Sequence, residues 1–60
     1  MGKLEDLVVS TLESSDEGLT LAEIAEKIGQ SEKKVFKALR KLFEKDMVES
    51  ENRRYRLSNR

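Results

Sequence analysis

The sequence predicts a small, mainly α-helical fold in which three helices are followed by a β-hairpin. Two amphipathic segments, residues 20–28 and 32–45, are joined by a short turn. A further helical pattern covers residues 3–14, and residues 47–57 alternate between apolar and polar side chains as half-buried strands do. An isolated hairpin is marginal in water, so we expect its apolar side chains, Val48, Tyr55 and Leu57, to dock on the helices.

The first helix is predicted over residues 3–14, because four apolar side chains and one threonine recur at helical spacing. They are Leu4, Leu7, Val8, Thr11 and Leu12. Glu5 and Asp6 suit its first turn, because carboxylates stabilise the N-terminal end of a helix. The segment SSDEG at residues 14–18 is typical of a turn, and Leu19 follows as a short extended residue.

The second helix is predicted to begin with a capping box, in which Thr20 and Glu23 satisfy each other's backbone donors. Its expected core residues are Leu21, Ile24, Ala25 and Ile28. Gly29 is expected to end the helix, because glycine adopts the left-handed C-cap conformation without strain.

The third helix is predicted to start at a Ser31 cap and to run to about Lys45. At about 100° per residue, one arc is apolar and consists of Val35, Ala38, Leu39 and Leu42. The opposite side carries Lys33, Lys37 and Arg40, with Lys34 and Lys41 on its flank. The hairpin follows as a strand over 47–50, a turn over 51–53 and a return strand over 54–57.

Composition excludes several classes of function. The 60 residues suit one domain, 1–60, and contain neither cysteine nor histidine. Disulfides, thiolate metal sites and histidine-based catalysis are therefore excluded, and we expect no enzyme activity, metal, cofactor or small-molecule ligand. No apolar run is long enough for a signal peptide or membrane span, so a cytoplasmic protein is expected, nucleoid-associated if it binds DNA. The sequence shows no extra dimerisation helix, so a monomer is expected.

Charge is divided unevenly although the net charge is zero. Residues 1–30 hold two cations and seven carboxylates, which gives −5, and residues 31–60 hold ten cations and five carboxylates, which gives +5. This asymmetry favours a basic functional surface in the second half. The alternative is that charged residues simply solvate a small domain.

The pattern resembles the winged helix-turn-helix superfamily of small bacterial and archaeal DNA-binding domains. The stretch Thr20-x-x-Glu23-Ile24-Ala25-x-x-Ile28-Gly29 carries the resemblance, together with Ser31, Val35, Leu39, Leu42 and Met47-Val48. The family usually has glycine where Asp46 stands, and aspartate also tolerates a left-handed turn. Residues 12–29 also look like the N-terminal winged-helix region of phenylalanyl-tRNA synthetase α subunits. A match to Z-DNA-binding domains fails at Phe36 and Arg40 and in the proline-free hairpin.

The resemblance implies double-stranded DNA as the partner and transcriptional regulation as the function, with the third helix in the major groove. The DNA-binding residues it implies are Ser31, Lys33, Lys34, Lys37, Arg40, Lys41, Arg53, Arg54 and Arg56. The rival hypothesis is a protein-interaction module of a larger assembly. Phe36 and Phe43 are expected to pack against the hairpin or the first helix, and exposure of Phe36 is the observation that favours a protein partner or a thymine-methyl contact.

Overall fold

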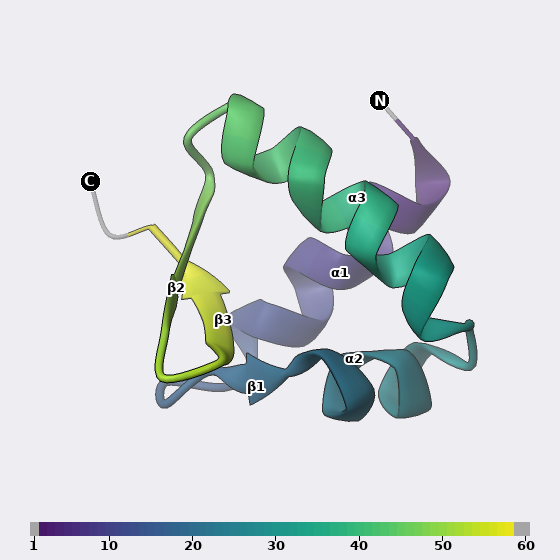
Figure 1. Cartoon of the computed structure of the whole chain (residues 1–60), viewed down its shortest axis with the longest axis horizontal. Helices are drawn as coiled ribbons and strands as arrows, with labels where there is room; N and C mark the ends of the chain where they lie inside the picture. Colours follow the sequence, from purple (N-terminus) through teal and green to yellow (C-terminus); the bar gives the residue numbers. More distant parts are fainter. Residues whose placement is uncertain (1, 59–60) are drawn as a thin grey trace.

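The computed structural model describes residues 2–58 and confirms three helices with a C-terminal hairpin, the architecture of a winged helix-turn-helix (Figure 1). The helices are α1 (Lys3–Glu13), α2 (Leu21–Ile28) and α3 (Glu32–Glu44). The strands are β1 (Leu19–Thr20), β2 (Val48–Glu51) and β3 (Arg54–Leu57). Residues 1, 59 and 60 of the predicted domain lie outside the described part of the chain.

The predicted helix ends are confirmed where α2 meets α3. The backbone N–H of Glu23 donates to the Thr20 hydroxyl at 3.2 Å, and the backbone N–H of Thr20 donates to the Glu23 carboxylate at 2.9 Å. Gly29 has φ +71°, the left-handed conformation that ends a helix. The Ser31 hydroxyl then accepts the backbone N–H of Lys34 at 3.3 Å. The turn therefore fixes the direction in which α3 leaves α2.

The sheet has three strands in the order β1-β3-β2, all antiparallel. Leu19 lies opposite Tyr55, so the short extended residue predicted before α2 pairs with the hairpin. Gly18, at φ +88°, precedes this pairing, and a Cβ there would lie 3.0 Å from the Tyr55 carbonyl oxygen. Only glycine fits this approach of the two backbones.

The hairpin turn is shorter than predicted. Glu51 belongs to β2, so Asn52 and Arg53 alone make the turn, at φ +54° and +66°. Two left-handed residues form the kind of two-residue turn whose twist matches that of the flanking strands. Asp46, at φ +60°, adopts the predicted left-handed turn after α3.

The core lies where the three helices meet the sheet. Its buried residues are Val8, Leu12, Leu19, Ile24, Ala25, Val35, Ala38, Leu39, Leu42 and Val48. Leu7 lies in α1 as its spacing predicted, but its side chain is 46% exposed and does not join the core. The buried stripe of α1 is rotated instead toward Glu5, Val8 and Leu12. Leu21 and Ile28, predicted as buried in α2, are half-buried.

Candidate nucleic-acid interface

Helix α3 presents five exposed cations on the side away from the core. They are Lys33, Lys34, Lys37, Arg40 and Lys41. The adjacent Ala38 and Leu39 are buried, which fixes the helix in this orientation. Within residues 2–58, none of the five forms an ion pair with a carboxylate. Their charges are therefore available to an anionic partner.

Ser31 lies at the start of this surface, and its side chain is exposed. Its hydroxyl already accepts one hydrogen bond from the Lys34 backbone N–H as the helix cap. The hydroxyl proton can still be donated outward, because a hydroxyl donates one hydrogen bond while it accepts others.

Three of the α3 cations meet the beginning of α1 in a groove of about 330 Å³. Lys34, Lys37 and Lys41 line it from α3, and Lys3 lines it from α1. Lys3 was not predicted as a site residue. Lys3 reaches the groove because α1 packs on α3. The two segments are about thirty residues apart in the sequence, so no local pattern indicates that they meet.

Two of the three hairpin cations, unlike those of α3, already have hydrogen-bond partners within the protein. The Arg54 guanidinium donates to the Gly18 carbonyl oxygen at 3.2 Å, which joins the hairpin to the turn before β1. The Arg56 guanidinium donates to the carboxylates of Glu49 at 3.4 Å and Glu51 at 3.3 Å. Arg53 is exposed at the tip, and the described residues give it no ion pair.

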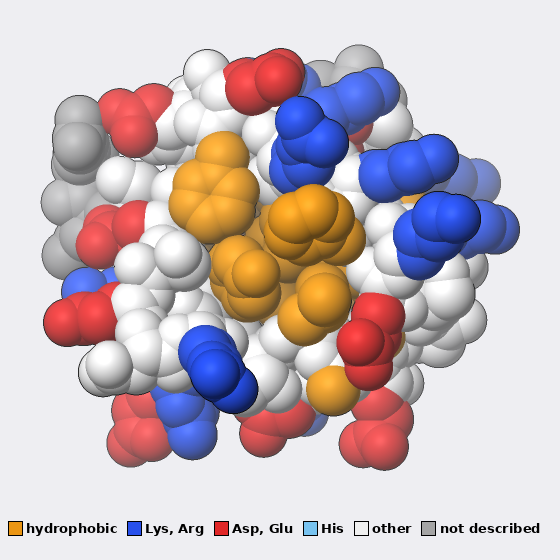
Figure 2. Space-filling model, in the orientation of Figure 1, with side chains coloured by type: hydrophobic (Ala, Val, Ile, Leu, Met, Phe, Trp, Pro, Cys, Tyr) orange, Lys and Arg blue, Asp and Glu red, His pale blue; other side chains and the backbone are white. Residues whose placement is uncertain are grey.

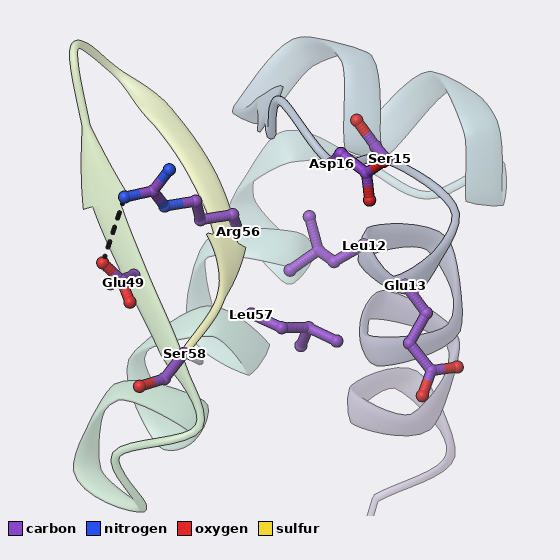
Figure 3. Close-up of a pocket in the computed structure, with 8 residues that line it drawn as sticks. All are labelled: Leu12, Glu13, Ser15, Asp16, Glu49, Arg56, Leu57 and Ser58. Atoms are coloured by element: carbon purple, nitrogen blue, oxygen red, sulfur yellow. Dashed lines mark hydrogen bonds and ion pairs between the residues drawn. The ribbon is translucent and has the colours of Figure 1, made fainter. Parts of the chain in front are cut away.

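Arg56 also borders a cleft of about 480 Å³ between the end of α1 and the hairpin. Figure 3 shows its guanidinium directed at Glu49, with Glu13 and Asp16 across the cleft. Carboxylates predominate around this cation. The structure thus separates Arg56 from the basic groove beside α3, although the sequence grouped them in one site.

An aromatic edge runs along α3 on the hairpin side. Phe43 packs against Tyr55 with ring centroids 6.0 Å apart at 65°, so the predicted packing on the hairpin is confirmed for Phe43. Phe36 is 44% exposed and Phe43 is 39% exposed. Figure 2 shows hydrophobic side chains gathered on the face between α3, α2 and the hairpin, with Lys and Arg side chains beside them. Both a basic surface and an apolar surface are therefore present.

The Glu23 carboxylate belongs to the fold rather than to a site, because it caps the start of α2. The hydrogen bond from the Thr20 backbone N–H lowers the pKa of Glu23 below its usual value, with smaller contributions from the Thr20 hydroxyl, Arg54 and Lys27. The described part of the chain holds no cluster of carboxylates suited to a metal ion. None of its helices has both the length and the apolar character needed to cross a membrane.

Comparison with known proteins agrees with this geometry. A family model described as the sugar-specific transcriptional regulator TrmB matches residues 8–59. The match covers the second half of α1 and the whole of α2, α3 and the hairpin, which confirms the expected winged helix-turn-helix relationship. Among curated proteins and among solved structures, none matches significantly.

Proposed function

The chain belongs to the family of the sugar-specific transcriptional regulator TrmB, and on that premise we propose that it binds double-stranded DNA through the outer face of α3. The family is one of transcriptional regulators and not a class of enzymes. DNA phosphates attract clustered Lys and Arg side chains, and a helix of this diameter fits the major groove. The binding surface is assigned to the nine residues named from the sequence, with α3 at its centre.

One observation carries this proposal. Helix α3 has five exposed cations, and none of them has a carboxylate partner within residues 2–58. An ion-paired cation must break its pair before it can contact a phosphate, whereas these five begin unpaired. With about five phosphate contacts, affinity should fall roughly 10²–10³-fold between 50 and 200 mM salt.

Base reading and backbone anchoring are assigned to different residues. Lys33 and Lys37 project from the outward side of α3, where they meet base edges when the helix enters the major groove. Arg53 at the hairpin tip meets the flanking backbone. Arg54 and Arg56 contribute less to binding than Arg53, because each already holds hydrogen-bond partners in the free protein.

The test is a fluorescence-anisotropy titration of a labelled mixed-sequence duplex at several salt concentrations. Lys33→Ala and Lys37→Ala should weaken binding, and loss of a bidentate guanine contact should change the preference between duplexes by about 1–3 kcal/mol. Lys27→Ala is the matched control, since Lys27 is exposed on α2 outside the assigned surface. Absence of binding by the unmodified protein at low salt contradicts the proposal.

The exposure of Phe36 favours a second candidate, a contact with a protein partner at the aromatic edge of α3. A solvent-facing aromatic beside other apolar side chains is typical of interaction surfaces. The same side chain could instead contact a thymine methyl group, because apolar side chains recognise that group in the major groove.

Phe36→Ser distinguishes these roles, with dA20·dT20 and dA20·dU20 as probe duplexes. A thymine-methyl contact predicts that the unmodified protein binds the thymine duplex more tightly and that Phe36→Ser removes the difference. An equal affinity of both proteins for both duplexes excludes that contact. A role in contacting a protein partner then requires two results. Sedimentation must detect association of the unmodified protein with a protein partner or a second copy of the chain, and Phe36→Ser must abolish that association while DNA affinity is retained.

A further inference from the structure

The groove between α1 and α3 brings four lysines together from two separate elements. Lys3 lies in the first turn of α1, and Lys34, Lys37 and Lys41 lie along one flank of α3. Leu4 and Ala38 also line the groove; Leu4 is half-buried and Ala38 is only 5% exposed. The groove therefore offers cationic side chains beside a small apolar surface.

One carboxylate, Glu5, also lines the groove, but its charge is offset. Its Oε1 lies 3.2 Å from the Lys45 ammonium, and its side chain is only 8% exposed. The lysines remain exposed, and none of the four has an ion pair within residues 2–58. The local charge is strongly positive, and the first backbone N–H groups of α1, which carry no side-chain cap, add to it.

The dimensions of DNA relate this groove to the duplex. A major groove about 12 Å wide is filled by one helix about 10–12 Å across, so the two flanks of that helix face the two sugar-phosphate walls. With Lys33 and Lys37 directed at the bases, one flank of α3 carries Lys34 and Lys41 toward one wall. Lys3 lies beside this flank, because α1 packs against α3.

The other flank is less suited to phosphates. It carries Phe36 and Phe43, and beyond them the hairpin, whose Arg54 and Arg56 are held by the Gly18 carbonyl and by two carboxylates. Only Arg53 at the tip is without such a partner among the described residues. The two sides of α3 therefore differ in the phosphate contacts they can make.

We propose that the groove lined by Lys3, Lys34, Lys37 and Lys41 is the principal phosphate-binding surface of the protein, with Lys3, Lys34 and Lys41 on the phosphates and Lys37 at its edge toward the bases, and that Lys3 is a direct DNA-backbone contact. The inference rests on the proposed DNA binding and adds to it the side of α3 on which the backbone is held. The duplex sugar-phosphate chain lies in the groove, with deoxyribose carbons against Leu4 and Ala38 and phosphates between the lysines.

Lys3→Gln and the double variant Lys3→Gln/Lys41→Gln test this arrangement by anisotropy with a mixed-sequence duplex between 50 and 200 mM salt. Each lost phosphate contact lowers the slope of log affinity against log salt by about 0.9. We expect one such step for Lys3→Gln and two for the double variant, with no change in preference between duplexes. Lys27→Gln, which removes an exposed cation elsewhere, should leave the slope unchanged.

Loss of folding is separated from loss of contact by thermal unfolding of each variant. A cation in the first turn opposes the helix dipole, so Lys3→Gln should leave the melting temperature equal or slightly higher. The groove assignment is overturned if Lys3→Gln has the same salt slope as the unmodified protein while the separate variant Lys33→Gln binds DNA more weakly. That result leaves DNA binding by α3 in place. Absence of duplex binding by the unmodified protein at 50 mM salt overturns both.

Discussion

The Lys45 ammonium lies 3.2 Å from Oε1 of Glu5 and joins the end of α3 to the first turn of α1. The two groups differ in exposure, at 44% for the Lys45 side chain and 8% for that of Glu5. A buried carboxylate is costly unless it is paired, so this contact lets Glu5 occupy the interface between the helices. It also holds α1 against α3 beside the lysine groove.

Lys45→Met should destabilise the fold by about 1–3 kcal/mol, because it leaves the buried Glu5 carboxylate without this partner while keeping an apolar side chain. Urea unfolding measures the change. Glu5→Gln is made alone and together with Lys45→Met, so that a double-mutant cycle isolates the pair. Strictly additive effects of the two substitutions contradict a coupling between Glu5 and Lys45.

Leu39→Ala should cost about 2–5 kcal/mol, because the Leu39 side chain is fully buried among the helices and its removal leaves a cavity. Leu7→Ala is chemically the same change at a side chain that is 46% exposed, and its effect should be small. Thermal unfolding followed by circular dichroism compares the two. Equal shifts in melting temperature would mean that the buried face of α1 or α3 is wrongly assigned.

The capping box of α2 should make stability depend on pH. The pKa of Glu23 is lowered in the folded state by the Thr20 backbone N–H, so its stabilising contribution is present above the unfolded-state pKa. That contribution is lost as pH falls through the lower folded-state pKa. Glu23→Gln keeps an acceptor oxygen and should remove this part of the pH dependence.

Unfolding measured from pH 7 to pH 3 tests the dependence, with Thr20→Ala as a second variant. Loss of the Thr20 cap should cost about 0.5–2 kcal/mol. The difference in unfolding free energy between the unmodified protein and Glu23→Gln should shrink as pH falls. If that difference stays constant over the whole pH range, ionisation of the Glu23 carboxylate does not contribute to stability.

Helix ends and the helical core were predictable because they depend on local chemistry. Thr20, Gly29 and Ser31 each specify a cap through side-chain or backbone geometry within four residues. The orientation of α1 was not predictable in full, since the partner of the buried Glu5 is Lys45, which is 40 residues away in the sequence. With Glu5, Val8 and Leu12 inward, Leu7 lies on the exposed side of the helix.

The cations of α3 were predictable from the helical period, and the structure leaves all five exposed. The difference between the hairpin arginines was not predictable from spacing. Arg54 is held by Gly18, which is distant in sequence, and Arg56 depends on the register that places Glu49 opposite it. Lys3 joins the candidate site only through the packing of α1 on α3.

Arg53→Gly should raise stability while it lowers DNA affinity. Arg53 has φ +66°, a left-handed conformation that costs a residue with a side chain roughly 1–2 kcal/mol and that glycine adopts freely. We expect a gain of about 1 kcal/mol, which raises Tm by about 4–8 °C for a chain of this size. The two-residue turn requires this conformation, and glycine is the residue that suits it best.

The function assigned to Arg53 is a phosphate contact from the hairpin tip, so Arg53→Gly should reduce the salt slope of duplex binding by about 0.9. Arg53→Lys is the matched control, because it keeps both the cation and the unfavourable backbone conformation; its stability and affinity should stay near those of the unmodified protein. A more stable Arg53→Gly variant with unchanged affinity and slope would show that the strained turn serves no DNA contact. The phosphate contacts would then be confined to α3 and the beginning of α1.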